Sequence, residues 1–109
     1  MNCRVIVLRS PRAQELGVIP YQEGGLDSRT VFFFPHIGST LVSGVGMTEG
    51  IRLYALDENL NFVDLPPFDP IVIVQPRHIF HLPPVTRHVV ETALGAPKLN
   101  DFEFLRKHL

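Results

Sequence analysis

Short apolar runs, interrupted every few residues by proline or glycine, dominate the hydrophobic pattern of the chain. The runs are rich in valine, isoleucine, phenylalanine, tyrosine and threonine, which is typical of short β-strands joined by turns. We therefore predict a single mainly β domain over residues 1–109, a small sandwich or partly open barrel of about seven to nine short, mostly antiparallel strands. The candidate strands are residues 3–9, 30–34, 40–45, 51–57, 60–65, 71–74, 78–82, 87–92 and 100–108.

One short helix is predicted near residues 11–16. Ser10 offers an N-cap, Pro11 suits the first helical position, and Gly17 suits the C-terminal stop. The segment that follows, residues 18–28, contains the run QEGG and is predicted to be a loop.

Three further predictions concern individual strands. Residues 51–65, IRLYALDENLNFVDL, form the clearest hairpin, with DEN as its turn. The continuous apolar run at residues 71–74 predicts a buried strand. In the tail, Phe102 and Phe104 are spaced by two, so we predict that both face inward from a last strand.

The three consecutive phenylalanines at positions 32–34 cannot all share one face of a strand. We predict that both faces of this strand are covered by core packing, and the alternative is a phenylalanine that lines a groove or a partner surface.

The strand predicted at residues 87–92 places Val89 and Glu91 on one face and His88 and Val90 on the other. Glu91 stands in an apolar strand and is interpreted as a charge at the rim or as half of a cross-strand ion pair. If it proves buried and paired, a functional role gains weight.

Charge and cysteine content exclude several classes of protein. Ten basic and eleven acidic residues are interleaved and give a formal net charge of -1, without the surplus of cations that nucleic-acid binding requires. The single cysteine, Cys3, excludes an internal disulfide and a cysteine-based zinc cluster. Arg9 and Pro11 interrupt the first apolar run too early for a secretory signal, and no run is long enough to span a bilayer. We expect a soluble, cytoplasmic monomer or weak homodimer with no membrane partner.

Six short motifs occur in order along nearly the whole chain: residues 12–17 (RAQELG), 31–35 (VFFFP), 45–50 (VGMTEG), 54–59 (YALDEN), 86–91 (TRHVVE, with Gly95 following) and 100–104 (NDFEF). In this order they resemble the family known as domain of unknown function 192. The resemblance implies a compact, mostly β domain with a short helix and no established activity. The chain departs from the family pattern at Gly46, where the family has tryptophan, and at Thr48-Glu49-Gly50, where it has Lys-Asn-Thr.

Gly44, Gly46 and Gly50 raise the question of a phosphate-binding loop. Such a loop needs a following helix whose N-terminus meets the phosphate, whereas residues 51–57 are predicted to be a strand. We predict turn or bulge glycines instead.

Histidines offer the alternative of a metal site, built from His36, His81 and His88 with Asp69. His78 and His81 lie three apart, on opposite faces of a regular strand, and cannot both reach one ion from it.

No spacing links a nucleophile, a base and an orienting group, so no catalytic residue and no cofactor is predicted. The predicted function is a non-enzymatic module that binds a small ligand or a protein through proline-bounded loops on a rigid β scaffold. The residues predicted for this surface are Met47, Thr48, Glu49, Arg77, His78, His81 and Arg87. The alternative is a metal-binding protein or metal-dependent hydrolase that uses His36, His81 and His88.

Overall fold

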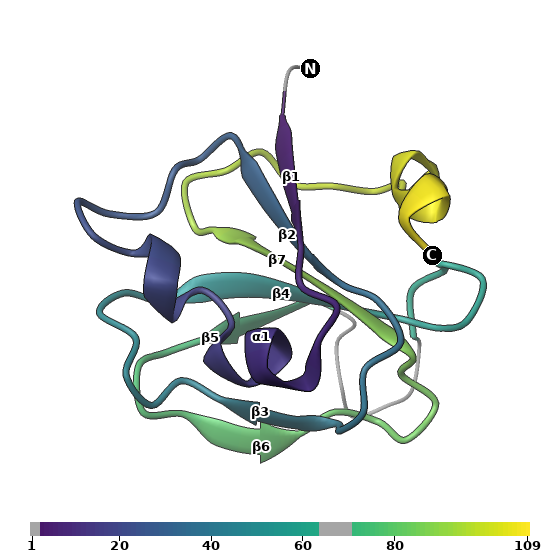
Figure 1. Cartoon of the computed structure of the whole chain (residues 1–109), viewed down its shortest axis with the longest axis horizontal. Helices are drawn as coiled ribbons and strands as arrows, with labels where there is room; N and C mark the ends of the chain where they lie inside the picture. Colours follow the sequence, from purple (N-terminus) through teal and green to yellow (C-terminus); the bar gives the residue numbers. More distant parts are fainter. Residues whose placement is uncertain (1–2, 64–70) are drawn as a thin grey trace.

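The computed structural model describes residues 3–63 and 71–109 and consists mainly of two β-sheets (Figure 1). The larger sheet has five strands in the order β1 (Arg4–Val7), β2 (Thr30–Phe34), β7 (His88–Ala93), β4 (Ile51–Leu56) and β5 (Ile71–Val74). Two short strands, β3 (Leu41–Ser43) and β6 (Ile79–His81), pair into a separate ribbon. Strands β1 and β2 are parallel, and the other pairings of these strands are antiparallel. The predicted mainly β fold is confirmed, and over the described residues the sheets are not closed into a barrel.

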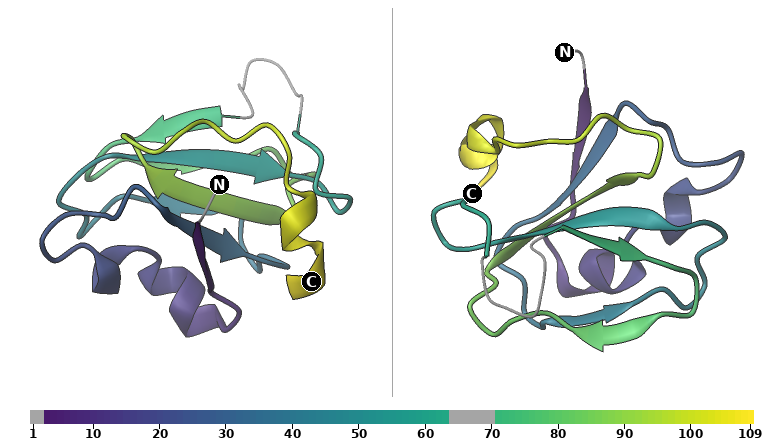
Figure 2. Two further views of the ribbon diagram at one scale, coloured as in Figure 1. Left: turned by 90° about the horizontal axis from the view of Figure 1, so that it is seen from above. Right: turned by 180° about the vertical axis from the view of Figure 1, so that it is seen from behind.

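The predicted helix is confirmed as α1 (Pro11–Leu16). The Ser10 hydroxyl accepts a hydrogen bond from the Ala13 N–H at 3.0 Å, and Gly17 ends the helix with φ 55°, which glycine adopts without strain. A one-turn 3₁₀ helix, η1 (Ile19–Tyr21), lies within the segment predicted as a loop. Both α1 and η1 lie on the same side of the larger sheet (Figure 2). Within residues 3–63 and 71–109, no helix is long and apolar enough to cross a membrane.

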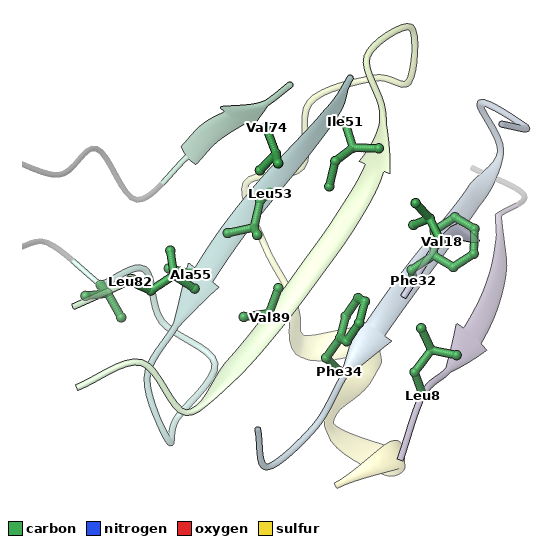
Figure 3. Close-up of a cluster of buried hydrophobic side chains, with 11 residues drawn as sticks. Leu8, Val18, Phe32, Phe34, Ile51, Leu53, Ala55, Val74, Leu82 and Val89 are labelled. Carbon is green, nitrogen blue, oxygen red and sulfur yellow. The ribbon is translucent and has the colours of Figure 1, made fainter. Parts of the chain in front are cut away.

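Strand β2 is covered on both faces, as predicted from its three phenylalanines. Phe32 and Phe34 belong to one buried cluster and Phe33 to the other, because successive side chains of a strand point to opposite faces. Figure 3 shows Phe32 and Phe34 on the same face of the sheet as Leu53 and Val89. The two clusters form the core, one on each face of the larger sheet.

The predicted hairpin at residues 51–65 is wrong in its second arm. Strand β4 pairs with β7 and β5, and the described part of the second arm is not a strand. The chain does turn back as predicted, through the antiparallel Leu56–Phe62 bridge and the Val63 N–H, which donates to the Ala55 carbonyl at 3.0 Å. The Asp57 carboxylate accepts the N–H groups of Asn59 and Asn61 at 2.8 and 3.0 Å. A side chain that bonds the backbone in this way competes with a strand ladder. Residues 64–65 of the predicted arm lie outside the described residues.

Strand β5 is not buried as predicted. It lies at the edge of the larger sheet with β4 as its neighbour, and Ile73 is 42 % exposed. An apolar run alone does not distinguish an edge strand from a central one, because both present one face to the core.

The predicted C-terminal strand is instead a 3₁₀ helix, η2 (Glu103–His108). Local hydrogen bonds favour the helical turn: the Asp101 carboxylate accepts the Glu103 N–H at 2.8 Å, and Arg106 pairs with Glu103 at 2.6 Å. In this conformation Phe102 is buried but Phe104 is 38 % exposed, so the prediction that both face inward is wrong.

Candidate functional site

A cavity of about 560 Å³ lies between the larger sheet and the segments that cover one of its faces. This volume lies within the range of roughly 300 to 1,000 Å³ that is found for small-molecule pockets. The wall is mostly apolar, with Phe34, Ile51, Leu53, Val74 and Val89 from the sheet (Figure 3) and Leu16, Val18 and Val42 from the covering segments.

One row of neighbouring side chains crosses all five strands on the face of the sheet that bounds this cavity. In register order the row consists of Ile6, Phe32, Glu91, Leu53 and Val72. Direct cross-strand partners share one face of a sheet. The only polar member of the row is therefore Glu91, on the central strand β7, and it lines the cavity.

The Glu91 side chain makes no hydrogen bond and no ion pair within the part of the chain that the structure describes. Burial raises the pKa of its carboxyl to about 8, because removal from water favours the neutral form. Its direct neighbours across the sheet are Phe32 and Leu53. Among these residues Glu91 is therefore neither a rim charge nor half of a cross-strand ion pair, which corrects the expectation from sequence.

Among the described residues, three other ionisable side chains line the cavity, and all three are exposed. Arg9 follows β1, Glu15 lies on α1, and His36 follows β2. No ionisable side chain reaches the lining from β3, β4 or β5. The exposed groups mark the mouth of the cavity, and Glu91 is the ionisable group at its floor.

The remaining polar side chains of the lining are bonded to the backbone. The Gln14 amide donates to the carbonyl oxygens of Leu8 and Pro35 at 3.0 and 2.9 Å, which ties α1 to the ends of β1 and β2. The hydroxyls of Ser39 and Ser43 each accept the N–H two residues further on, at 3.1 and 3.2 Å. These contacts hold the wall in place.

The predicted binding loop, residues 47–49, is only partly at this cavity. Met47 lines it, whereas Thr48 and Glu49 anchor the loop to the segment before β2. The Gln22 side-chain oxygen accepts the Thr48 N–H at 2.9 Å, and the Glu49 carboxylate accepts the Leu26 N–H at 3.4 Å.

The glycines of this region serve the chain geometry, as predicted. A Cβ added to Gly44 would overlap the carbonyl oxygen of Gln75, and Gly46 has φ 92°. Strand β4 begins directly after Gly50, so the helix that a phosphate loop requires does not follow.

The other predicted binding residues do not line the cavity. Arg77 and His78 lie in the connection between β5 and β6, with Arg77 at φ 68°. His81 ends β6 and is exposed, and Arg87 donates to the Pro84 carbonyl at 2.8 Å. These predicted binding residues therefore do not form one continuous surface with the cavity.

The predicted metal ligands include one adjacent pair. The His36 N–H donates to Nδ1 of His88 at 2.9 Å, and the two rings meet edge to face with centroids 4.8 Å apart. Burial, followed by the charge of His36, lowers the pKa of His88. In residues 3–63 and 71–109 no three His, Cys, Asp or Glu side chains lie close enough to hold an ion. Asp69 lies outside the described residues, and the metal site stays a prediction.

The sequence singled out Glu91 as a charge within an apolar strand, but Glu91 was not among the predicted binding residues. Alternation placed it on the same face as Val89, and the available signal was one charge within the apolar run HVVETA. The cavity above it was not predictable, because its walls come from segments distant in sequence.

Comparison with protein-family models, with curated proteins and with solved structures finds no match for the chain. The resemblance to domain of unknown function 192 therefore stays a prediction.

Proposed function

We propose that the protein is a module that binds a small, largely apolar ligand in the cavity over the larger sheet. The observation that carries this proposal is a cavity of about 560 Å³ whose apolar walls surround one half-buried carboxyl, that of Glu91. Sites for small molecules typically combine apolar walls with a few placed polar groups.

Binding fits the described residues better than a chemical reaction does. Gln14, Ser39 and Ser43 are the neutral polar side chains of the lining, and each is bonded to the backbone. Within the described part of the chain, none of them is hydrogen-bonded to Glu91 in the way that links a base to a nucleophile. The same bonds preform the walls, which reduces the ordering that a ligand must impose.

A neutral apolar fluorophore, N-phenyl-1-naphthylamine, tests this function by fluorescence titration. We expect saturable binding at one site per chain. Val42→Phe inserts a larger side chain from a half-buried position on β3 that lines the cavity. We expect it to weaken binding by about tenfold or more, because the ring occupies ligand volume.

Ile79→Phe is the matched control, since Ile79 lies on the partner strand β6, is 59 % exposed and does not line the cavity. It should bind the fluorophore within about twofold of the unsubstituted protein, as expected for a surface change. Met47→Phe repeats the test from a second half-buried position of the lining. Absence of saturable binding, or equal weakening by Ile79→Phe, contradicts the proposed function.

A further inference from the structure

We propose that the occupant of the cavity is a primary or secondary ammonium ion attached to an apolar body, with the Glu91 carboxylate as its ion-pair partner. This proposal rests on the proposed function and adds the chemical class of the ligand. It also gives a role to a carboxyl that has no partner among the described residues and lies in the middle of a five-stranded sheet.

The shape of the ligand follows from the walls. Phe32 and Leu53 flank Glu91 across the sheet, and Val89 lies on the same face of the same strand. Phe34 and Ile51 extend the apolar lining. At the floor of the cavity a molecule that reaches the carboxyl is therefore surrounded by hydrocarbon, and there only the end that meets Glu91 can be polar without loss.

The sign of the polar end follows from the charges that face Glu91. Glu15 comes from α1, Arg9 from the segment after β1 and His36 from the segment after β2, and all three are exposed. Strands β3, β4 and β5 contribute no ionisable group to the lining. Within the described residues no buried cation lies beside Glu91 to pair with an anionic ligand, whereas an ammonium ligand supplies charge-assisted N–H donors to the Glu91 carboxylate.

The class of ligand can be determined from the number of protons that the protein releases or takes up on binding. Burial keeps Glu91 protonated in the empty cavity at neutral pH, since its pKa is about 8. When R–NH₃⁺ binds, the carboxyl loses its proton to solvent and the products are the pair Glu91–COO⁻···⁺H₃N–R and one H⁺. A neutral alcohol leaves the proton on Glu91. A carboxylate ligand shares the proton of Glu91 or takes one up.

Three compounds with one apolar body provide the test: 1-naphthylmethylamine, 1-naphthylmethanol and 1-naphthoate. Isothermal titration at pH 6, 7 and 8, in phosphate and in Tris, measures both affinity and proton release. We expect the amine to bind at pH 8 about tenfold tighter than the alcohol or more, as for a desolvated ion pair. Its affinity should rise with pH by about tenfold per unit below pH 8, with nearly one proton released at pH 7.

Two variants separate Glu91 from the other groups. Glu91→Gln keeps the shape and removes the charge, so it should abolish the preference for the amine and leave alcohol binding within about threefold, as expected for an isosteric change. Histidines also titrate in this range, so His36→Gln is the control, and it should keep the pH dependence. The order of affinities of the three compounds for the unsubstituted protein tests the ligand class even without either variant, and the two variants assign the released proton to Glu91.

The outcomes distinguish this inference from the proposed function. If the fluorophore and the alcohol bind but the amine shows neither preference nor proton release, the ammonium class is wrong and the apolar site stands. Tighter binding of the naphthoate also overturns the ammonium class. If the fluorophore and all three compounds fail to bind, both proposals are wrong.

Discussion

Strand β7 carries Val89 and Glu91 toward the cavity, and it carries His88 and Val90 toward the packed core on the other face of the sheet. On that second face two polar side chains, Tyr54 and His88, have partners. The Tyr54 hydroxyl accepts the Leu99 N–H at 3.0 Å, and Nδ1 of His88 accepts the His36 N–H at 2.9 Å.

Aromatic packing completes the second face. The rings of Phe102 and Tyr54 pack edge to face with their centroids 5.3 Å apart, and the rings of Phe62 and Phe102 pack edge to face with their centroids 5.4 Å apart. Three buried atoms lack a partner within the described residues, namely Arg52 Nε, Thr86 Oγ1 and Thr92 Oγ1. Alternation places Arg52 and Thr92 on this second face, toward the end of β7, and none of the three residues lines the cavity.

The difference between the faces separates two roles of a polar group on a central strand of the sheet. A satisfied group such as the Tyr54 hydroxyl contributes to a rigid core, because its hydrogen bond replaces the one it made with water. The Glu91 carboxyl has apolar neighbours and open space, so it reduces stability when ionised. That combination is expected where a ligand, and not the chain, supplies the partner.

The largest effect is expected from Tyr54→Ala, which breaks the packed face. It removes a fully buried aromatic side chain and leaves the Leu99 N–H without its acceptor. We expect a loss of about 5 kcal/mol in the free energy of unfolding, measured by urea denaturation.

Two further variants, at Tyr54 and at the adjacent Leu53, separate the contribution of the hydroxyl and compare the two faces of the sheet. Tyr54→Phe removes only the hydroxyl and should lose about 1 to 2 kcal/mol. Leu53→Ala, which faces the cavity, should lose about 2 kcal/mol, at the low end for this substitution, because one side of Leu53 already borders open space. Equal losses for Leu53→Ala and Tyr54→Ala contradict the view that only one face is fully packed.

The second effect concerns Glu91 and pH. The folded protein holds this proton up to a pKa of about 8, whereas the unfolded chain releases it near 4.5. The contribution of Glu91 to folding is therefore most favourable below pH 4.5 and becomes less favourable as pH rises to 8. The difference corresponds to roughly 4 kcal/mol.

Glu91→Gln should remove this slope and be more stable than the unsubstituted protein at pH 8 by roughly that amount, in urea titrations at pH 5, 6.5 and 8. Glu15→Gln, at the exposed mouth, is the control and should keep the slope. Parallel stability profiles for Glu91→Gln and the unsubstituted protein would show that Glu91 is ionised and solvated.

The smallest effect is expected at His88, on the packed face. Its pKa is lowered by burial and by His36, and the backbone of Glu58 and the charge of Asp57 oppose that effect. Because the folded state binds this proton less readily than the unfolded chain, stability falls as pH drops below 6.5.

His88→Gln should make thermal unfolding less sensitive to pH below 6.5, and the exposed His81→Gln should leave that sensitivity unchanged. An unchanged profile in His88→Gln would mean that the imidazole is not desolvated. The slopes at His88 and Glu91 have opposite signs, which allows the two faces to be separated in one pH series.

Predictions were correct where capping residues decided the structure, and wrong where pairing between distant strands or side-chain hydrogen bonds in the tail decided it. The bounds of α1 were predicted correctly because Ser10, Pro11 and Gly17 act on neighbouring backbone groups. The second arm of the hairpin was wrong because β7 pairs along one edge of β4 and β5 pairs along most of the other edge, where the arm was expected. The tail was wrong because spacing by two does not report the bonds of Asp101 and Arg106 that form η2.

By itself the sequence determined the mainly β class, the short helix, and the alternation that puts Glu91 on the same face as Val89, since each depends on periodicity or on capping within a few residues. Only the tertiary structure decided that Glu91 lies between Phe32 and Leu53 under a cavity. Strand order, register and the placement of α1 depend on contacts between segments far apart in the chain. These contacts leave the Glu91 carboxyl half-buried and without a partner among the described residues.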